Sequence, residues 1–84
     1  MRRREIAREI RKAAREWGTS WDDTGDTEMI ECHREDARDL MRVAKLVEVG
    51  RFQKARDACE MDTIVREQLP SEFFDLLEKK GIPW

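Results

Sequence analysis

Residues 27–50 read TEMIECHREDARDLMRVAKLVEVG, and this stretch decides the fold. Its apolar side chains recur every three or four positions, which is the spacing that gathers residues on one face of an α-helix. The shared face holds Met29, Ile30, His33, Ala37, Leu40, Met41, Ala44 and Val47. Asp26 or Thr27 is suited to cap the start of this helix, and Gly50 is suited to end it. The pattern therefore predicts a long central helix over about 27–49.

The residues before this stretch predict a second amphipathic helix over about 2–17. Its apolar face is formed by Ile6, Ile10, Ala13, Ala14 and Trp17. Gly18 follows the last apolar position, so we expect it to end the helix in a left-handed conformation. Residues 18–26, GTSWDDTGD, are rich in side chains that bond to the backbone in turns, which predicts a loop between the two helices.

The residues after the central helix predict a turn and two further helices. Gly50–Ala55, GRFQKA, has a Gly-x-Phe-x-x-Ala spacing that is similar to the turn inside a tetratricopeptide repeat. No second copy occurs at the ~34-residue period of such arrays, so the resemblance implies only a helical hairpin. A third helix is predicted over about 51–69, either continuous or split near 62. Pro70 ends it, and Ser71 is expected to cap a fourth helix over about 71–80.

Together these elements predict an all-α single domain over residues 1–84, a small compact bundle of about four helices. The long central helix is expected to pack against the other three. The chain has no run of about 18 apolar residues and no apolar segment behind its basic start, so we expect neither a membrane span nor a secretory signal. A cytoplasmic protein is the resulting expectation, and there Cys32 and Cys59 would be reduced.

The sequence contains no recognisable catalytic motif or metal-binding motif. Cys32 and His33 are neighbours on a helix and point ~100° apart, which rules them out as a nucleophile and base in contact. A zinc site built from these two residues and Cys59 lacks the paired spacing of structural zinc ligands. We therefore expect no enzymatic activity, no cofactor and no metal, and a partly buried structural role for His33.

The charged residues are sorted around the helices. They make up 43% of the 84 residues, yet the net charge is only −2. In the helix over about 2–17, a ladder of four arginines lies within ~60° of rotation, opposite the apolar face: Arg4, Arg8, Arg11 and Arg15. The central helix carries a similar row of Arg34, Arg38, Arg42 and Lys45. Such rows are either solvated faces that pair with neighbouring acids or docking surfaces for an anionic partner.

Two of the three tryptophans have no predicted burial. Trp17 belongs to the apolar face of its helix, whereas Trp21 lies in the polar loop and Trp84 lies at the end of the chain. Tryptophan is enriched among the residues that dominate protein–protein binding energies. The alternative is that each ring folds back over a helix end.

These features favour a non-enzymatic protein-interaction module that docks on a larger protein complex. In size and charge the chain is similar in style to small phage or mobile-element accessory and inhibitor proteins. The alternative is a nucleic-acid-associated regulator that contacts phosphates through the arginine ladder. The candidate partner-binding residues are Arg4, Arg8, Arg11, Arg15, Trp21, Arg34, Arg38 and Trp84. A homo-oligomer is also predicted through the central helix, because the spacing of three and four is sustained by Ile30, His33, Ala37, Leu40, Ala44 and Val47.

Overall fold

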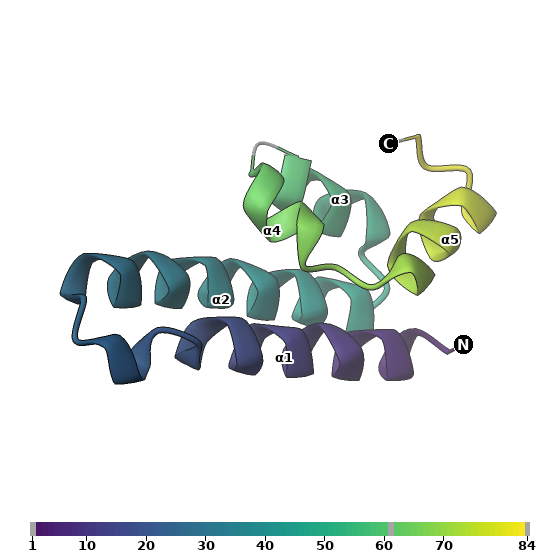
Figure 1. Ribbon diagram of the computed structural model, residues 1–84. Coiled ribbons are helices and arrows are strands. Elements are labelled where there is room, and N and C mark those ends of the chain that lie inside the picture. The colour runs from purple at the N-terminus through teal and green to yellow at the C-terminus, as the bar shows by residue number, and fades with distance from the viewer. Residues whose placement is uncertain (1, 61, 84) are drawn as a thin grey trace.

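The computed structural model describes residues 2–60 and 62–83, and within them it confirms the all-α fold class, since no strand occurs. Figure 1 shows the order of the elements. They are α1 (Arg3–Thr19), the 3₁₀ turn η1 (Asp22–Thr24), α2 (Thr27–Glu48), α3 (Phe52–Glu60), α4 (Thr63–Glu67) and α5 (Ser71–Lys79). Trp84, a candidate partner-binding residue, lies outside the described residues.

The two long helices α1 and α2 form an antiparallel hairpin (Figure 1). Each places its apolar row against the other, because burying these rows is the main driving force available to a chain of this size. From α1 the buried residues are Ile6, Ala7, Ile10, Ala14 and Gly18. From α2 they are His33, Leu40, Val43, Ala44 and Val47.

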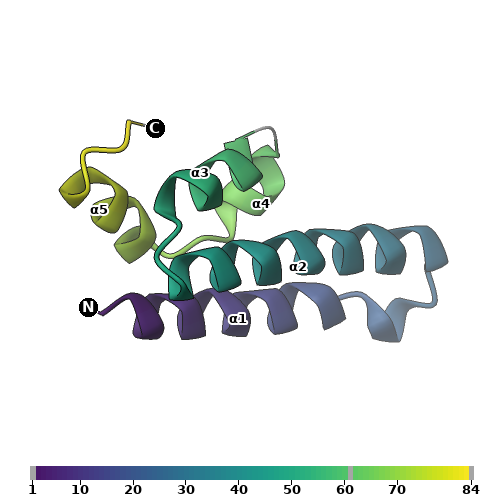
Figure 2. The same ribbon diagram turned by 180° about the vertical axis from the view of Figure 1, so that it is seen from behind.

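The three short helices cover only one part of this hairpin. Figures 1 and 2 show α3 and α4 over the C-terminal half of α2, and α5 beside the N-terminal end of α1. They complete the core with Ala55, Cys59, Val65, Phe73 and Leu77, joined by Leu69 from the linker between α4 and α5. The far end of the hairpin, with the loop between α1 and α2, extends beyond them. The molecule is therefore elongated, with principal extents of 43 × 23 × 18 Å.

The helix ends follow the capping residues in most places. The Asp26 side chain accepts a hydrogen bond from the Met29 backbone amide at 3.2 Å and starts α2. Gly50 follows α2 with a φ of 83°, a left-handed conformation that glycine adopts without strain. Asp62 caps α4 by accepting from the backbone amides of Ile64 and Val65, which makes α3 and α4 separate helices with a break near residue 62.

Two predicted helix ends were wrong. Gly18 does not end α1 in a left-handed conformation but lies buried inside the helix, which continues to Thr19. Its lack of a side chain serves the close packing of α1 on α2 instead. Ser71 is the first residue of α5, and Pro70 occupies the capping position without a side-chain hydrogen bond. Proline suits this position because its missing amide hydrogen has no helical partner there in any case.

The predicted self-association face of α2 is largely covered within the chain. His33, Leu40, Ala44 and Val47 are buried against the other helices, whereas Ile30 and Ala37 of the same row are half-buried. Self-association itself stays a prediction. Among the residues that the structure describes, no helix combines the length and the apolar character needed to cross a membrane.

Candidate partner-binding groove

Arginines from α1 and α2 line an open groove between the two helices. The groove has a volume of about 500 Å³. Its apolar part is formed by side chains of both helices, and its polar part is dominated by cations. The groove is lined by Ala14, Arg15, Gly18, Thr19, Asp22, Arg34, Ala37, Arg38 and Met41. It therefore combines an apolar floor with arginine rims.

The floor exists because small residues face each other where the helices approach. Ala14 and Gly18 are one turn apart on α1, and Ala37 and Met41 are one turn apart on α2. A Cβ atom built on Gly18 would lie 2.9 Å from the Cβ atom of Ala37, so only glycine permits this approach. Met41 is 42% exposed, which leaves an apolar and adaptable side chain at the surface of the groove.

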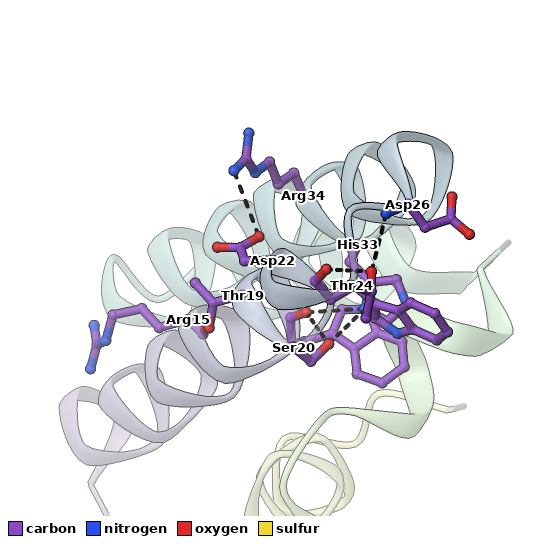
Figure 3. Close-up of polar contacts among 10 residues, drawn as sticks. Arg15, Thr19, Ser20, Asp22, Thr24, Asp26, His33 and Arg34 are labelled. Atoms are coloured by element: carbon purple, nitrogen blue, oxygen red, sulfur yellow. Dashed lines mark hydrogen bonds and ion pairs between the residues drawn. The ribbon is translucent and has the colours of Figure 1, made fainter.

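The rims carry arginine on both sides. Arg15 comes from α1, whereas Arg34 and Arg38 come from α2. The Arg34 guanidinium lies 3.6 Å from the Asp22 carboxylate at the loop end of the groove (Figure 3). Within the described part of the chain, Arg15 and Arg38 form no ion pair within 4 Å. Both cations are solvent-exposed and available to an anionic partner.

The arginine ladder of α1 leads from this groove toward the other end of the hairpin. A second hollow of about 600 Å³ is lined by Arg3, Arg4, Arg8, Arg11, Arg15, Glu48 and Val49, and it shares Arg15 with the groove. The ladder is not uniformly exposed, because Arg11 is half-buried and forms an ion pair with Glu48 of α2, whereas Arg4, Arg8 and Arg15 are exposed. The hydrogen bond and charge of Arg11 lower the pKa of Glu48 below its ordinary value. Arg11 is thus engaged within the chain.

Trp21 does not line the groove. Its ring belongs to an aromatic cluster with Trp17 and His33. Its ring meets the buried His33 ring edge-on at 5.7 Å, and Trp17 stacks on His33 at 4.2 Å. His33 Nδ1 lies 3.1 Å from the Trp17 carbonyl oxygen and 2.9 Å from Ser20 Oγ (Figure 3). The Ser20 hydroxyl also donates to the Trp17 carbonyl oxygen at 2.8 Å, so the three groups form one polar contact at the end of α1. His33 has the structural role that was predicted, closing the loop end of the hairpin.

The two cysteines and a cluster of three aspartates lie outside the groove. Cys32 is exposed on α2 and Cys59 is buried on α3, and both are free thiols. Asp36, Asp39 and Asp62 bring carboxylate oxygens within 4.8 Å of one another. Asp36 accepts a hydrogen bond from Trp17 Nε1, and Asp62 caps α4. Burial, followed by the charges of the other two carboxylates, raises the pKa of Asp39.

Sequence reasoning found the rims of the groove but missed its floor. Arg15, Arg34 and Arg38 were candidates because of their charge. Gly18 and Ala37 were assigned to a helix end and to a buried or self-associating face. The available signal was the small-residue pair at positions 14 and 18, one helical turn apart, which is typical of a close helix–helix approach.

Comparisons with known protein families, with curated proteins and with solved structures found no match, so the groove has to be interpreted from its own chemistry.

Proposed function

We propose that this protein is a non-enzymatic binding module that holds an acidic surface of a partner protein in the groove between α1 and α2. The observation that supports this most directly is the convergence of Arg15, Arg34 and Arg38 on one apolar floor. Guanidinium groups bind carboxylates in a planar, bidentate geometry that is stronger and more specific than a simple charge contact. The exposed Met41 and the half-buried Ala37 supply apolar area that a protein partner can bury.

The composition of the groove favours a protein partner over a nucleic acid. Phosphates are held by cations and polar groups, and the apolar floor of Ala14, Ala37 and Met41 offers them nothing. Glu48 neutralises Arg11 within the ladder. A protein segment that alternates apolar and acidic side chains matches both parts of the groove.

Nucleic acid remains the second candidate because of the hollow beside the groove. There Arg3, Arg4 and Arg8 extend the row of cations from Arg15 toward the start of α1. A polyanion lying along this row would release counterions, so its affinity would fall steeply with salt. The two candidates therefore predict different ionic-strength dependence.

The test compares two double variants of equal charge change. Arg15→Ala with Arg38→Ala removes cations from both rims of the groove, and Lys12→Ala with Lys79→Ala removes two exposed cations from outside it. Each protein is immobilised and exposed to extract of the native host, and the bound proteins are quantified by mass spectrometry. We expect an acidic protein that the wild type and the lysine variant retain and that the arginine variant loses.

Direct titrations with duplex DNA and with single-stranded RNA complete the test. We expect Kd values no tighter than about 1 μM near physiological salt, the range of non-specific binding. Tighter binding that the arginine variant loses would overturn the proposal. In that case each removed arginine should flatten the log–log salt dependence by about one unit.

A further inference from the structure

The floor of the groove offers few backbone groups for hydrogen bonding. Most of it is built from side chains of α1 and α2, whose backbone amides and carbonyls are paired inside the helices. Only the last turn of α1, at Gly18 and Thr19, has carbonyls without a partner in the helix, and these accept hydrogen bonds but donate none. An extended segment lying on it would leave its own amides and carbonyls without partners against an apolar surface. Strand addition needs the open edge of a sheet, and residues 2–60 and 62–83 contain no strand. A helix, in contrast, satisfies its own backbone.

We infer that the occupant of the groove is an acidic amphipathic α-helix of the partner protein, lying between α1 and α2. This inference rests on the proposed function and specifies the partner segment. The apolar row of the bound helix packs on the exposed Met41 and the half-buried Ala37, above the buried Ala14 and Gly18. Its carboxylates project to both sides, toward the arginines of the two rims.

The positions of the cations predict the pattern of the bound helix. Arg34 and Arg38 are one helical turn apart on α2, so they match two carboxylates spaced four residues apart on one flank. Arg15 stands on the opposite rim and matches an acid on the other flank. Between the flanks, apolar residues recur at intervals of three and four. The small floor residues let the helix approach closely, because the distance between packed helices is set by the side chains at their contact.

A displayed library of random peptides of about 18 residues, five helical turns, provides the probe. It is selected in parallel against the wild type, against the rim variant Arg15→Glu with Arg38→Glu, and against the matched variant Lys12→Glu with Lys79→Glu. Circular dichroism first establishes that each protein is folded. The most enriched peptide is then synthesised, together with a version carrying proline at its centre, and both are titrated against the wild type and against Met41→Asp. Met41 is exposed, so this last substitution leaves the core intact.

We expect the wild type and the lysine variant to enrich acidic peptides with the predicted pattern, and the rim variant to lose them. The synthetic peptide should gain helical signal on binding, and proline or Met41→Asp should each weaken it at least tenfold. Enrichment of acidic peptides without helical periodicity, or binding that tolerates proline, overturns the helix inference and leaves the proposed function standing. Enrichment that is not acidic, that the rim variant shares, or that fails to occur at all overturns both.

Discussion

Gly18→Ala is predicted to destabilise the protein, although the same change stabilises most helices. Gly18 lies inside α1, where alanine has the higher helix propensity by about 1 kcal/mol. The added methyl group, however, would lie 2.9 Å from the Cβ atom of Ala37. Carbon atoms in contact prefer a separation of about 3.5–4.0 Å, so α1 and α2 have to move apart.

The magnitude follows from the balance of these two effects. Inserting a methyl group into a packed interface costs about 1–3 kcal/mol. Subtracting the gain in helix propensity leaves a net loss of about 1 kcal/mol in the free energy of unfolding. Ala37→Gly alone should cost a similar amount, because it places glycine within α2. The double variant exchanges the two residues between the helices and removes the clash, so it should be nearly as stable as the wild type.

Urea denaturation followed by helical circular dichroism measures all four proteins of this cycle. The expected result is a coupling of about 2 kcal/mol between the two positions, since each single variant loses about 1 kcal/mol and the double variant almost none. Gly25→Ala serves as the control, since Gly25 has a φ of 74° and no atom within 4 Å of an added Cβ. It should lose stability through backbone strain alone and show no coupling to Ala37→Gly. The reasoning fails if Gly18→Ala is as stable as the wild type, or if the double variant is additive within about 0.5 kcal/mol.

Three further predictions concern the core, one ion pair and the thiols. Ile10→Asp should abolish the helical signal, because Ile10 is fully buried and an unpaired charge there costs about 4 kcal/mol or more; a cooperative thermal transition in this variant would contradict the core assignment. The ion pair with Arg11 lowers the pKa of Glu48, so its stabilising effect is present above the ordinary carboxyl range and is lost as pH falls through the lowered value. Glu48→Gln should therefore make the acid-induced loss of stability shallower, and an unchanged pH profile would show that the pair contributes nothing. Burial raises the pKa of the Cys59 thiol to about 11, whereas Cys32 is exposed, so a thiol reagent near pH 8 should label one cysteine in the native protein and the second only after unfolding, as counted by mass spectrometry.

The helices could be predicted from the sequence because their determinants are local. The spacing of apolar residues located α1 and α2, and Asp26 and Gly50 marked the ends of α2 through hydrogen bonding and a left-handed backbone that depend only on neighbouring residues. The break near residue 62 had a similar local cause in the Asp62 cap. Element type and these particular helix ends therefore required no knowledge of the tertiary structure.

The floor of the groove could not be predicted because its determinants are not local. A glycine after the last apolar position of a helix looks the same in sequence whether it ends the helix or admits a neighbouring one. What distinguishes the two cases at Gly18 is Ala37, a residue of another helix. The apolar row of α2 posed the same difficulty. Its spacing predicted that this face is buried. It did not indicate whether α1 and the short helices bury the face or whether a second copy of the chain does.

The arginine rims offer a way to separate folding from binding. Arg38 lies four residues from both Arg34 and Arg42, and Arg15 lies four residues from Arg11. Each such pair of like charges destabilises a helix by about 0.2–0.5 kcal/mol. Replacing Arg15 and Arg38 by alanine should therefore leave the free energy of unfolding unchanged or raise it by up to about 1.5 kcal/mol, while binding is lost. A loss of more than about 1 kcal/mol would assign the rims to the fold. Arginines that lower the stability of the free protein are expected at a surface that binds a partner, because functional sites often break the rules that favour stability.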